Sequence, residues 1–143
     1  MQLYFELKRF DDIDTRLLYE MGRLRQEVFV VEQECWYLDF DGRDYWAHHL
    51  FAYEVGDVNK RILGYCRLLP PGLNYASASC IGRIVNRLDL RGKGIGQAIT
   101  REAIAQIKRL YPTHEIRISA QSRLVRFYQD LGFTVTDIEY MED

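Results

Sequence analysis

The sequence predicts an α/β domain, of the kind that some schemes class as α+β, in which a mixed, mostly antiparallel twisted sheet carries helices on both faces. Three observations favour this class. Short segments of alternating or β-branched apolar residues recur along the 143 residues. Segments with helical spacing separate several of them. A strand, glycine turn, helix, strand, helix, strand block fills the C-terminal half, and the predicted order is β-α-β-β-β-α-β-α-β.

The N-terminal third predicts one strand, one helix and a long loop. Apolar and polar residues alternate over residues 3–8, which is typical of a strand with one buried face. Asp12 and Asp14 are N-cap candidates for a helix that continues to Val28 with one apolar face. The stretch 35–46 is polar and aromatic, and we expect a long loop there.

The middle of the chain predicts a hairpin and a third strand. Residues 48–55 and 61–69 are strand-like, and turn residues 56–60 join them. Residues 79–86 contain Ile and Val and form the next predicted strand. Strands joined by a short turn pair antiparallel, so this region supplies the antiparallel part of the sheet.

The C-terminal half predicts alternating helices and strands. Residues 94–110 have apolar residues in helical register, and residues 115–120 alternate like a strand. A second helix is predicted over residues 124–131 and a last strand over residues 134–140. One face of that second helix carries Leu124, Phe127, Tyr128 and Leu131.

Composition excludes several classes of protein. Hydrophobic residues make up 48% of the chain, enough for a core, and we expect residues 1–143 to form a single domain. The net charge of −2 gives no basic excess for nucleic acid. The first ten residues are too polar for a signal peptide, and no run of 18 apolar residues would span a membrane. Three widely spaced cysteines predict free thiols. We therefore expect a cytoplasmic protein.

The most informative segment is Arg91-Gly92-Lys93-Gly94-Ile95-Gly96, which we call the glycine loop. It follows a predicted strand and opens a predicted helix, so free amides and the helix dipole can face a phosphate there. The dinucleotide fingerprint GxGxxG fails at Gln97, and the Walker pattern fails as well. A purely architectural glycine turn is the alternative.

Two motifs together resemble the GNAT acetyltransferases. The glycine loop is similar to the R-x-x-G-x-G pyrophosphate loop of that family. Downstream, the segment 124–133, with Phe127-Tyr128 followed by Gly132-Phe133, resembles the closing GNAT element. The two motifs occur in the order that the family has, separated by one helix and one strand. The resemblance implies the GNAT fold.

The N-terminal half resembles the ElaA family of bacterial GNAT proteins more specifically. The resemblance rests on segments 24–35, 41–44, 48–50, 81–83 and 119–121, and it covers nearly the whole chain. Trp36 stands where that family usually has Pro. The sequence ends at Asp143, where relatives usually continue into a final strand. A missing last strand would leave an open sheet edge that invites pairing, so a homodimer is one assembly to expect.

The resemblance implies transfer of an acetyl group from acetyl-CoA to an amine by direct attack, with no metal. Residues 91–96 would hold the pyrophosphate through Arg91, Gly92, Lys93, Gly94, Ile95 and Gly96. The strand residues Ile84, Val85 and Asn86 would present backbone groups to the pantetheine arm and the thioester carbonyl. Donation to that carbonyl stabilises the tetrahedral oxyanion. The acceptor amine is not identified by the sequence.

Tyr128 is the candidate acid for the departing thiolate, because a phenol holds its proton at neutral pH. A core position for Tyr128 is the alternative. Glu32 and His48 are candidate bases, with a solvated charge, a packed histidine and proton loss to solvent as alternatives. Strand alternation sends His48 and His49 to opposite faces. Arg25 and Arg83 are expected to be surface or ion-pair residues, though either could orient an anionic acceptor group.

Four other hypotheses compete with catalysis at the glycine loop. Asp41, Asp44, His48 and His49 do not have the spacing of a tight metal chelate, and Cys35 lacks a convincing His partner for nucleophilic chemistry. A non-catalytic CoA-binding module would keep the glycine loop and leave the acid and base unused. A protein-interaction module would need neither.

Overall fold

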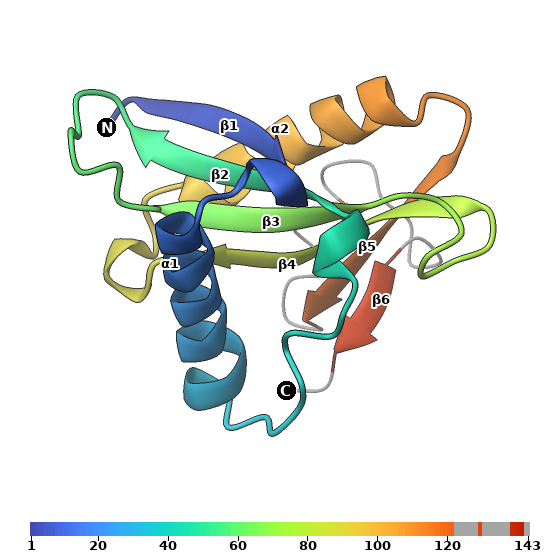
Figure 1. Cartoon of the computed structure of the whole chain (residues 1–143), viewed down its shortest axis with the longest axis horizontal. Coiled ribbons are helices and arrows are strands. Elements are labelled where there is room, and N and C mark those ends of the chain that lie inside the picture. Colours follow the sequence, from blue (N-terminus) through green and yellow to red (C-terminus); the bar gives the residue numbers. More distant parts are fainter. Residues whose placement is uncertain (122–128, 130–137, 142–143) are drawn as a thin grey trace.

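The computed structural model describes residues 1–121, 129 and 138–141. Its strands form a six-stranded sheet in the order β1-β2-β3-β4-β5-β6, and helices pack against it (Figure 1). The strands are β1 (Leu3–Arg9), β2 (His48–Glu54), β3 (Gly64–Leu69), β4 (Ala78–Asn86), β5 (Glu115–Gln121) and β6 (Ile138–Met141). The helices are η1 (Phe10–Asp12), α1 (Thr15–Arg25), η2 (Gln26–Glu32), η3 (Asp44–Trp46), η4 (Leu88–Leu90) and α2 (Ile95–Leu110).

The sheet is mixed and mostly antiparallel, as predicted. Neighbours from β1 to β4 pair antiparallel, whereas β4 pairs with β5, and β5 with β6, in parallel. Helix α2 connects the parallel strands β4 and β5, which is the crossover that a parallel pair requires. The GNAT fold expected from the resemblance is confirmed by the solved structures described below.

Helix α1 covers one face of the sheet. The Asp14 side chain accepts a hydrogen bond of 2.8 Å from the Leu17 amide and caps the helix. Met21 and Leu24 then pack against Phe51 of β2 in a buried cluster. The predicted helix to Val28 is therefore confirmed to Arg25, and it continues as η2, a π-helix, to Glu32.

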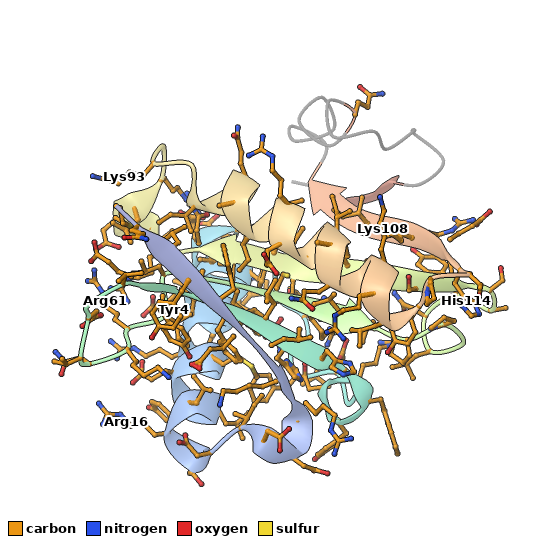
Figure 2. The ribbon with its side chains drawn as sticks, turned by 90° about the horizontal axis from the view of Figure 1, so that it is seen from above. Tyr4, Arg16, Arg61, Lys93, Lys108 and His114 are labelled. Atoms are coloured by element: carbon orange, nitrogen blue, oxygen red, sulfur yellow. The ribbon has the colours of Figure 1, made fainter. Side chains whose placement is uncertain are left out.

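Helix α2 covers the opposite face, so the two helices enclose the sheet (Figure 2). Alternate residues of β2 point to opposite faces. Leu50 and Ala52 pack with Ile99 and Ala103 of α2, whereas Phe51 faces α1. This alternation explains why β2 is buried along most of its length.

Three predicted elements differ from the structure or lie outside its described part. The strand predicted over 61–69 begins at Gly64, and the turn before it contains Lys60 with a positive φ. The loop predicted over 35–46 is confirmed, with η3 near its end. The helix predicted over 124–131 and most of the strand predicted over 134–140 lie outside the described residues.

Candidate functional site

The glycine loop lies between β4 and α2, as the sequence predicts, and the short helix η4 precedes it. Gly92 and Gly94 have φ of 81° and 79°, in the left-handed region that favours glycine. Gly94 is the N-cap of α2 and offers no side chain to the first helical amides. A Cβ placed on Gly94 or Gly96 would meet no heavy atom of the described residues within 4 Å. The first-turn amides have no partner within the helix, so this open start of α2 suits a phosphate.

Close packing beneath the loop sets its position. Gly64 opens β3, and a Cβ there would lie 3.0 Å from Ile95 Cγ2 and 3.4 Å from the Val85 carbonyl oxygen. Glycine at this position lets the first turn of α2 lie against the sheet. Ile95 also packs with Leu63 and Leu90 in a small buried cluster. The amides of the first turn are thus held by a packed helix.

Arg91 and Lys93 supply the two positive charges of the loop. The Arg91 guanidinium donates to both carboxylate oxygens of Glu32, at 2.7 and 2.5 Å. Such a two-pronged contact fixes the orientation of the guanidinium plane. Lys93 is exposed and lies at the tip of the loop in Figure 2. The predicted base Glu32 is therefore an ion-pair partner of the predicted phosphate ligand Arg91.

The second half of β4 separates from β5 (Figure 1). Pairing between the two strands ends at Ile81 and Ile118. Beyond that point, β4 still pairs with β3 as far as Asn86. Among the described residues, none pairs with the β5-facing edge of 82–86. Backbone groups of Ile84, Val85 and Asn86 can therefore bind an extended ligand arm as an added strand would.

A β-bulge lies where this open edge begins. Two β4 residues, Arg83 and Ile84, face a single β3 residue, Cys66. Arg83 has φ of 51°, which a non-glycine residue adopts only at a cost of roughly 1–2 kcal/mol. Its side chain reaches the α1 face, where Nε donates to Asp39 Oδ1 at 2.8 Å. Ion pairing therefore holds the strained residue that starts the open edge.

Arg83 belongs to a buried ion-pair network that fixes residues 35–46, which we call the aspartate loop. Arg25 is fully buried in α1, and it donates from Nε to Asp39 at 2.9 Å and from Nη1 to Asp44 at 2.8 Å. Arg67 of β3 donates to Asp41 at 2.8 Å. Buried ion pairs of this kind need every charge to be matched. The three carboxylates of the loop meet that condition through three arginines.

The network shifts the pKa values of its members. Burial by itself lowers the pKa of Arg25, but Tyr65, Asp44 and Asp39 outweigh it, and the net shift is upward. Burial by itself raises the pKa of Asp41, but hydrogen bonds from Arg67 and the Arg43 amide and the positive charge of Arg67 outweigh it, and the net shift is downward. Both groups are charged near neutral pH.

His49 lies beneath this network as a neutral, fully buried ring. Its Nε2 is 2.9 Å from the Asp44 carbonyl oxygen, and its Nδ1 is 2.6 Å from the Tyr65 hydroxyl. A carbonyl only accepts, so Nε2 donates to Asp44 and Nδ1 accepts from Tyr65. Burial lowers the pKa of His49 and keeps the ring uncharged.

The other predicted site residues lie in different places. His48 is on the α2 face of β2, and burial, followed by the charges of Arg9 and Arg109, lowers its pKa. Arg109 is in the last turn of α2, whereas the glycine loop is at the start of that helix. The structure therefore does not bring His48 to the glycine loop. Tyr128 lies outside the described residues.

Sequence reasoning did not foresee the buried network. The expectation that Arg25 and Arg83 are ion-pair residues is confirmed, but the burial of Arg25 was not predicted. One signal was available, because Arg67 interrupts an apolar strand and needs an anion when it is buried. Among the described residues, no three His, Cys, Asp or Glu side chains gather to hold a metal. Asp41 and Asp44 are instead bound by arginines.

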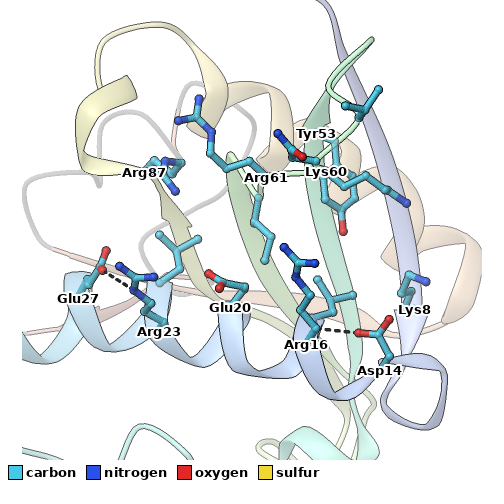
Figure 3. A pocket seen from close by; sticks show the side chains of 15 residues that line it. Lys8, Asp14, Arg16, Glu20, Arg23, Glu27, Tyr53, Lys60, Arg61 and Arg87 are labelled. Atoms are coloured by element: carbon cyan, nitrogen blue, oxygen red, sulfur yellow. Dashed lines mark hydrogen bonds and ion pairs between the residues drawn. The ribbon is translucent and has the colours of Figure 1, made fainter.

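A separate cavity of about 550 Å³ lies between α1 and the turn that joins β2 to β3 (Figure 3). Leu24, Tyr53 and Ile62 form part of its lining, and charged side chains surround them. These charged residues are Lys8, Asp14, Arg16, Glu20, Arg23, Glu27, Lys60, Arg61 and Arg87. The structure describes the whole glycine loop, and none of its residues lines this cavity. The cavity is therefore distinct from the predicted phosphate site.

None of the helices in the described part of the chain combines the length and the apolar character needed to cross a bilayer. Cys35, Cys66 and Cys80 are free thiols, as predicted, and Cys66 and Cys80 are buried in strands. Cys35 is exposed at the start of the aspartate loop.

Comparisons with known proteins agree with this geometry. A family model described as "Acetyltransferase (GNAT) domain" matches residues 23–143. The UPF0039 protein sll0451 of Synechocystis is 42% identical over 135 residues, which cover 94% of this chain and 84% of that protein. The Escherichia coli protein ElaA is 31% identical over 92% of this chain and 84% of its own length.

Two solved structures share the fold over most of their length. The crystal structure of E. coli ElaA aligns with a TM-score of 0.84, covering 93% of this chain and 88% of that one. An acyl-CoA N-acyltransferase from Pseudomonas aeruginosa aligns with a TM-score of 0.82 at 36% identity, covering 93% of this chain and 89% of that one. Each covers 93% of this chain, so they support the same architecture for it.

Proposed function

Because the chain belongs to the GNAT acetyltransferase family, in the group of proteins that includes ElaA, we propose that it transfers the acetyl group of acetyl-CoA to a primary amine of a small molecule or a peptide. One observation carries the proposal. The glycine loop, with its free first-turn amides, follows β4 after the short helix η4, and no described residue pairs with the β5-facing edge of β4 from residue 82 to residue 86. This arrangement suits a diphosphate joined to an extended thioester arm.

The glycine loop binds the diphosphate in this proposal. The amides of Ile95 and Gly96 donate to phosphate oxygens, and the helix dipole adds positive potential. Gly92 and Gly94 supply the left-handed backbone, while Arg91 and Lys93 add charge. The arm then runs along the open edge of β4, where Ile84, Val85 and Asn86 offer backbone groups. A backbone amide that donates to the thioester carbonyl stabilises the developing oxyanion.

The chemistry is a direct transfer within a ternary complex. The lone pair of the neutral amine attacks the carbonyl carbon, the C–N bond forms, and the C–S bond breaks. Tyr128 then protonates the departing thiolate, the acylated nitrogen gives up its second proton, which restores the Tyr128 phenol through solvent, and an amide and free CoA leave. In this proposal the proton that the acceptor ammonium loses goes to solvent. Glu32 is ion-paired with Arg91, and His48 lies near Arg9 and Arg109, away from the glycine loop.

Glu32 is a positioning residue for Arg91 in this proposal. Its carboxylate holds the guanidinium in a two-pronged ion pair and faces a cation, so it is not free to take a proton from the amine. We expect Glu32→Gln to change acetyl-CoA affinity. When kcat is measured against pH, its fall at low pH should remain in this variant. Loss of that fall at low pH would show that Glu32 is the base.

The proposal is tested by calorimetry with acetyl-CoA and by CoA release with a panel of amines. We expect Tyr128→Phe to lower kcat by roughly 100-fold or more while acetyl-CoA affinity stays near that of the native protein. Tyr19→Phe, at an exposed tyrosine of α1, is the matched control. Absence of acetyl-CoA binding overturns the proposal. Binding without transfer to any amine supports the alternative of a non-catalytic CoA-binding module.

A further inference from the structure

Tyr53 of β2 is a buried side chain whose hydroxyl has no hydrogen-bond partner among the residues that the structure describes. The side chain is only 2% exposed. It lines the cavity between α1 and the β2–β3 turn, so its hydroxyl oxygen opens into that cavity. A buried hydroxyl without a partner costs free energy. This hydroxyl is therefore free to bind a group that enters the cavity.

The Tyr53 hydroxyl holds its proton and can donate a hydrogen bond. Burial, followed by the charge of Glu6, raises the pKa of this phenol above its ordinary value. Glu6 is itself bound by Lys60, whose Nζ donates to its two carboxylate oxygens at 2.5 and 3.1 Å. Figure 3 shows the Tyr53 ring pointing from β2 toward the start of α1, the turn that carries Arg16. A hydrogen-bond acceptor that enters the cavity would meet this donor.

Positive side chains outnumber carboxylates around the cavity. Six cationic and three carboxylate side chains line it. The excess remains when the carboxylates that pair with lining cations from outside are counted as well. Arg61 and Arg87 share the single carboxylate of Asp89, at 4.0 and 3.2 Å. In the described part of the chain, Lys8 and Arg16 form no ion pair. The cavity therefore favours an anion.

Apolar side chains form another part of the cavity lining. Leu17 and Leu24 come from α1, and Ile62 follows the β2–β3 turn. Leu24 and Ile62 are buried, and both belong to the cluster that packs α1 on the sheet. The cavity volume of about 550 Å³ lies in the range of small-molecule sites, roughly 300–1,000 Å³. An inorganic anion would leave the apolar lining uncovered, whereas an anion with an apolar body would cover it.

We infer that this cavity binds a small organic carboxylate with an apolar body, at a ligand site separate from the glycine loop. The carboxylate accepts a hydrogen bond from the Tyr53 hydroxyl and pairs with Arg16, whose planar guanidinium matches the shape of a carboxylate. The apolar body lies against Leu24 and Ile62. The structure describes every residue of the glycine loop, and none of them lines the cavity. The inference therefore does not depend on acetyl transfer.

Three probes that share one apolar body test the charge of the ligand. They are phenylpropionate, phenylpropionamide and phenylpropylamine, which are an anion, a neutral molecule and a cation. In heteronuclear NMR titrations of the full chain without acetyl-CoA, we expect phenylpropionate to bind with a dissociation constant at or below about 1 mM. The amide should bind at least about tenfold more weakly, and the amine more weakly still. Equal or tighter binding of the amide or the amine overturns the inference, as does the absence of phenylpropionate binding at about 10 mM.

Tyr53→Phe tests the hydroxyl itself, because the variant keeps the buried ring. We expect the dissociation constant of phenylpropionate to rise roughly tenfold or more, since a hydrogen bond to a charged group is lost. Tyr4→Phe is the matched control. Tyr4 is opposite Tyr53 in the β1–β2 register, with its ring centroid 5.4 Å away, but it does not line the cavity. It should leave the dissociation constant unchanged, and an equally unchanged value in Tyr53→Phe overturns the inference.

A second variant and the location of the NMR shift changes separate a lost site from a lost fold. Arg16→Gln, at an exposed position of α1, should weaken phenylpropionate binding and keep the urea unfolding midpoint of the native chain. Arg101→Gln, at an exposed position of α2, should change neither. In the native chain, phenylpropionate should shift the amide signals of residues 16–24 and 58–62. Shift changes confined to residues 91–96 would place the carboxylate at the glycine loop and overturn the inference.

Discussion

The glycine loop and the aspartate loop both join opposite charges, but they do so in opposite surroundings. The glycine loop relies on backbone amides and left-handed glycines at the open start of α2, and its one ion pair, Arg91 with Glu32, is partly exposed. The aspartate loop relies on side chains, and its arginines and carboxylates are buried on the α1 face. The first arrangement is ready to bind an outside anion. The second supplies its own anions.

From this difference we expect the glycine loop to contribute mainly to ligand binding and the aspartate loop mainly to stability. An amide at a helix start keeps its hydrogen-bonding capacity until a ligand arrives, so the glycine loop can be changed with modest loss of stability. A buried arginine loses its hydration on folding and depends on its carboxylates. Changes to the aspartate loop should therefore lower the free energy of unfolding, and changes to the glycine loop should lower ligand affinity.

The strongest test of that division is Arg25→Met. It removes a fully buried cation from Asp39 and Asp44, and we expect the free energy of unfolding to fall by about 3–5 kcal/mol. Arg23→Met is the matched control, because Arg23 is exposed on the same helix and pairs with Glu27 at 3.3 Å. We expect a change below about 0.5 kcal/mol there. Urea unfolding measures the free energy of unfolding of both variants. Equal losses of stability in Arg25→Met and Arg23→Met would contradict the idea that the buried aspartate-loop network carries the stability.

The next largest effect concerns Gly94→Ala. The new Cβ strains a residue with φ of 79° and adds a methyl group to the N-cap of α2, beside the first-turn amides. We expect the acetyl-CoA dissociation constant to rise at least about tenfold, with a stability loss near 1 kcal/mol. Gly56→Ala, at φ of 90° in the β2–β3 turn, should lose similar stability. It should leave acetyl-CoA affinity unchanged in calorimetry, and a parallel loss of affinity would contradict the prediction.

Sequence could predict the glycine loop because its geometry is local. Six consecutive residues contain the glycines, the charges and the helix start, and the preceding strand is apolar enough to recognise. The two faces of the sheet could be predicted as well, since Leu50 and Phe51 alternate as a strand buried on both faces requires. These features depend on neighbours within a few positions.

The aspartate loop depends on distant neighbours, and sequence could not place them. Arg25 meets Asp44 and Arg67 meets Asp41 only after the sheet and α1 have assembled. The left-handed conformation of Arg83 left no trace either, because glycine is the residue that usually marks such a position. Residue types showed that arginines and aspartates were present. Tertiary packing decided which of them would be buried together.

Arg83 offers a finer test, because its strain and its ion pairs can be separated. Arg83→Ala and Arg83→Gly both lose the contacts with Asp39 and Asp41, but only glycine relieves the cost of positive φ. We expect the Gly variant to be more stable than the Ala variant by about 1 kcal/mol in urea unfolding.

The control for this prediction is a regular strand position. At Glu54, the last residue of β2, Gly should be less stable than Ala, which is the usual order in a strand. If both positions showed that usual order, the bulge would not hold Arg83 in a left-handed conformation in solution. The test therefore reports on the open edge of β4 without any ligand.

The smallest expected effect is a pH dependence that originates beneath the aspartate loop. Burial lowers the pKa of His49, so the unfolded chain binds a proton more readily than the folded one. Stability is then fully present above the unfolded pKa of about 6.5 and is lost as pH falls below it. We expect a loss of less than about 1 kcal/mol between pH 7 and pH 6.

Carboxylates act in a different range of pH. The lowered pKa of Asp41 means that its contribution to stability is lost only in acid, below the ordinary range of an aspartate. The change in stability between pH 7 and pH 6 therefore comes from the histidines. The pKa of His48 is also lowered, so its contribution has to be distinguished from that of His49. Urea unfolding at several pH values gives the slope of the unfolding free energy against pH. His49→Asn should flatten this slope more than His48→Asn does, because His49 is fully buried and donates to the Asp44 carbonyl. An unchanged slope in His49→Asn would mean that this ring does not stay neutral under the network.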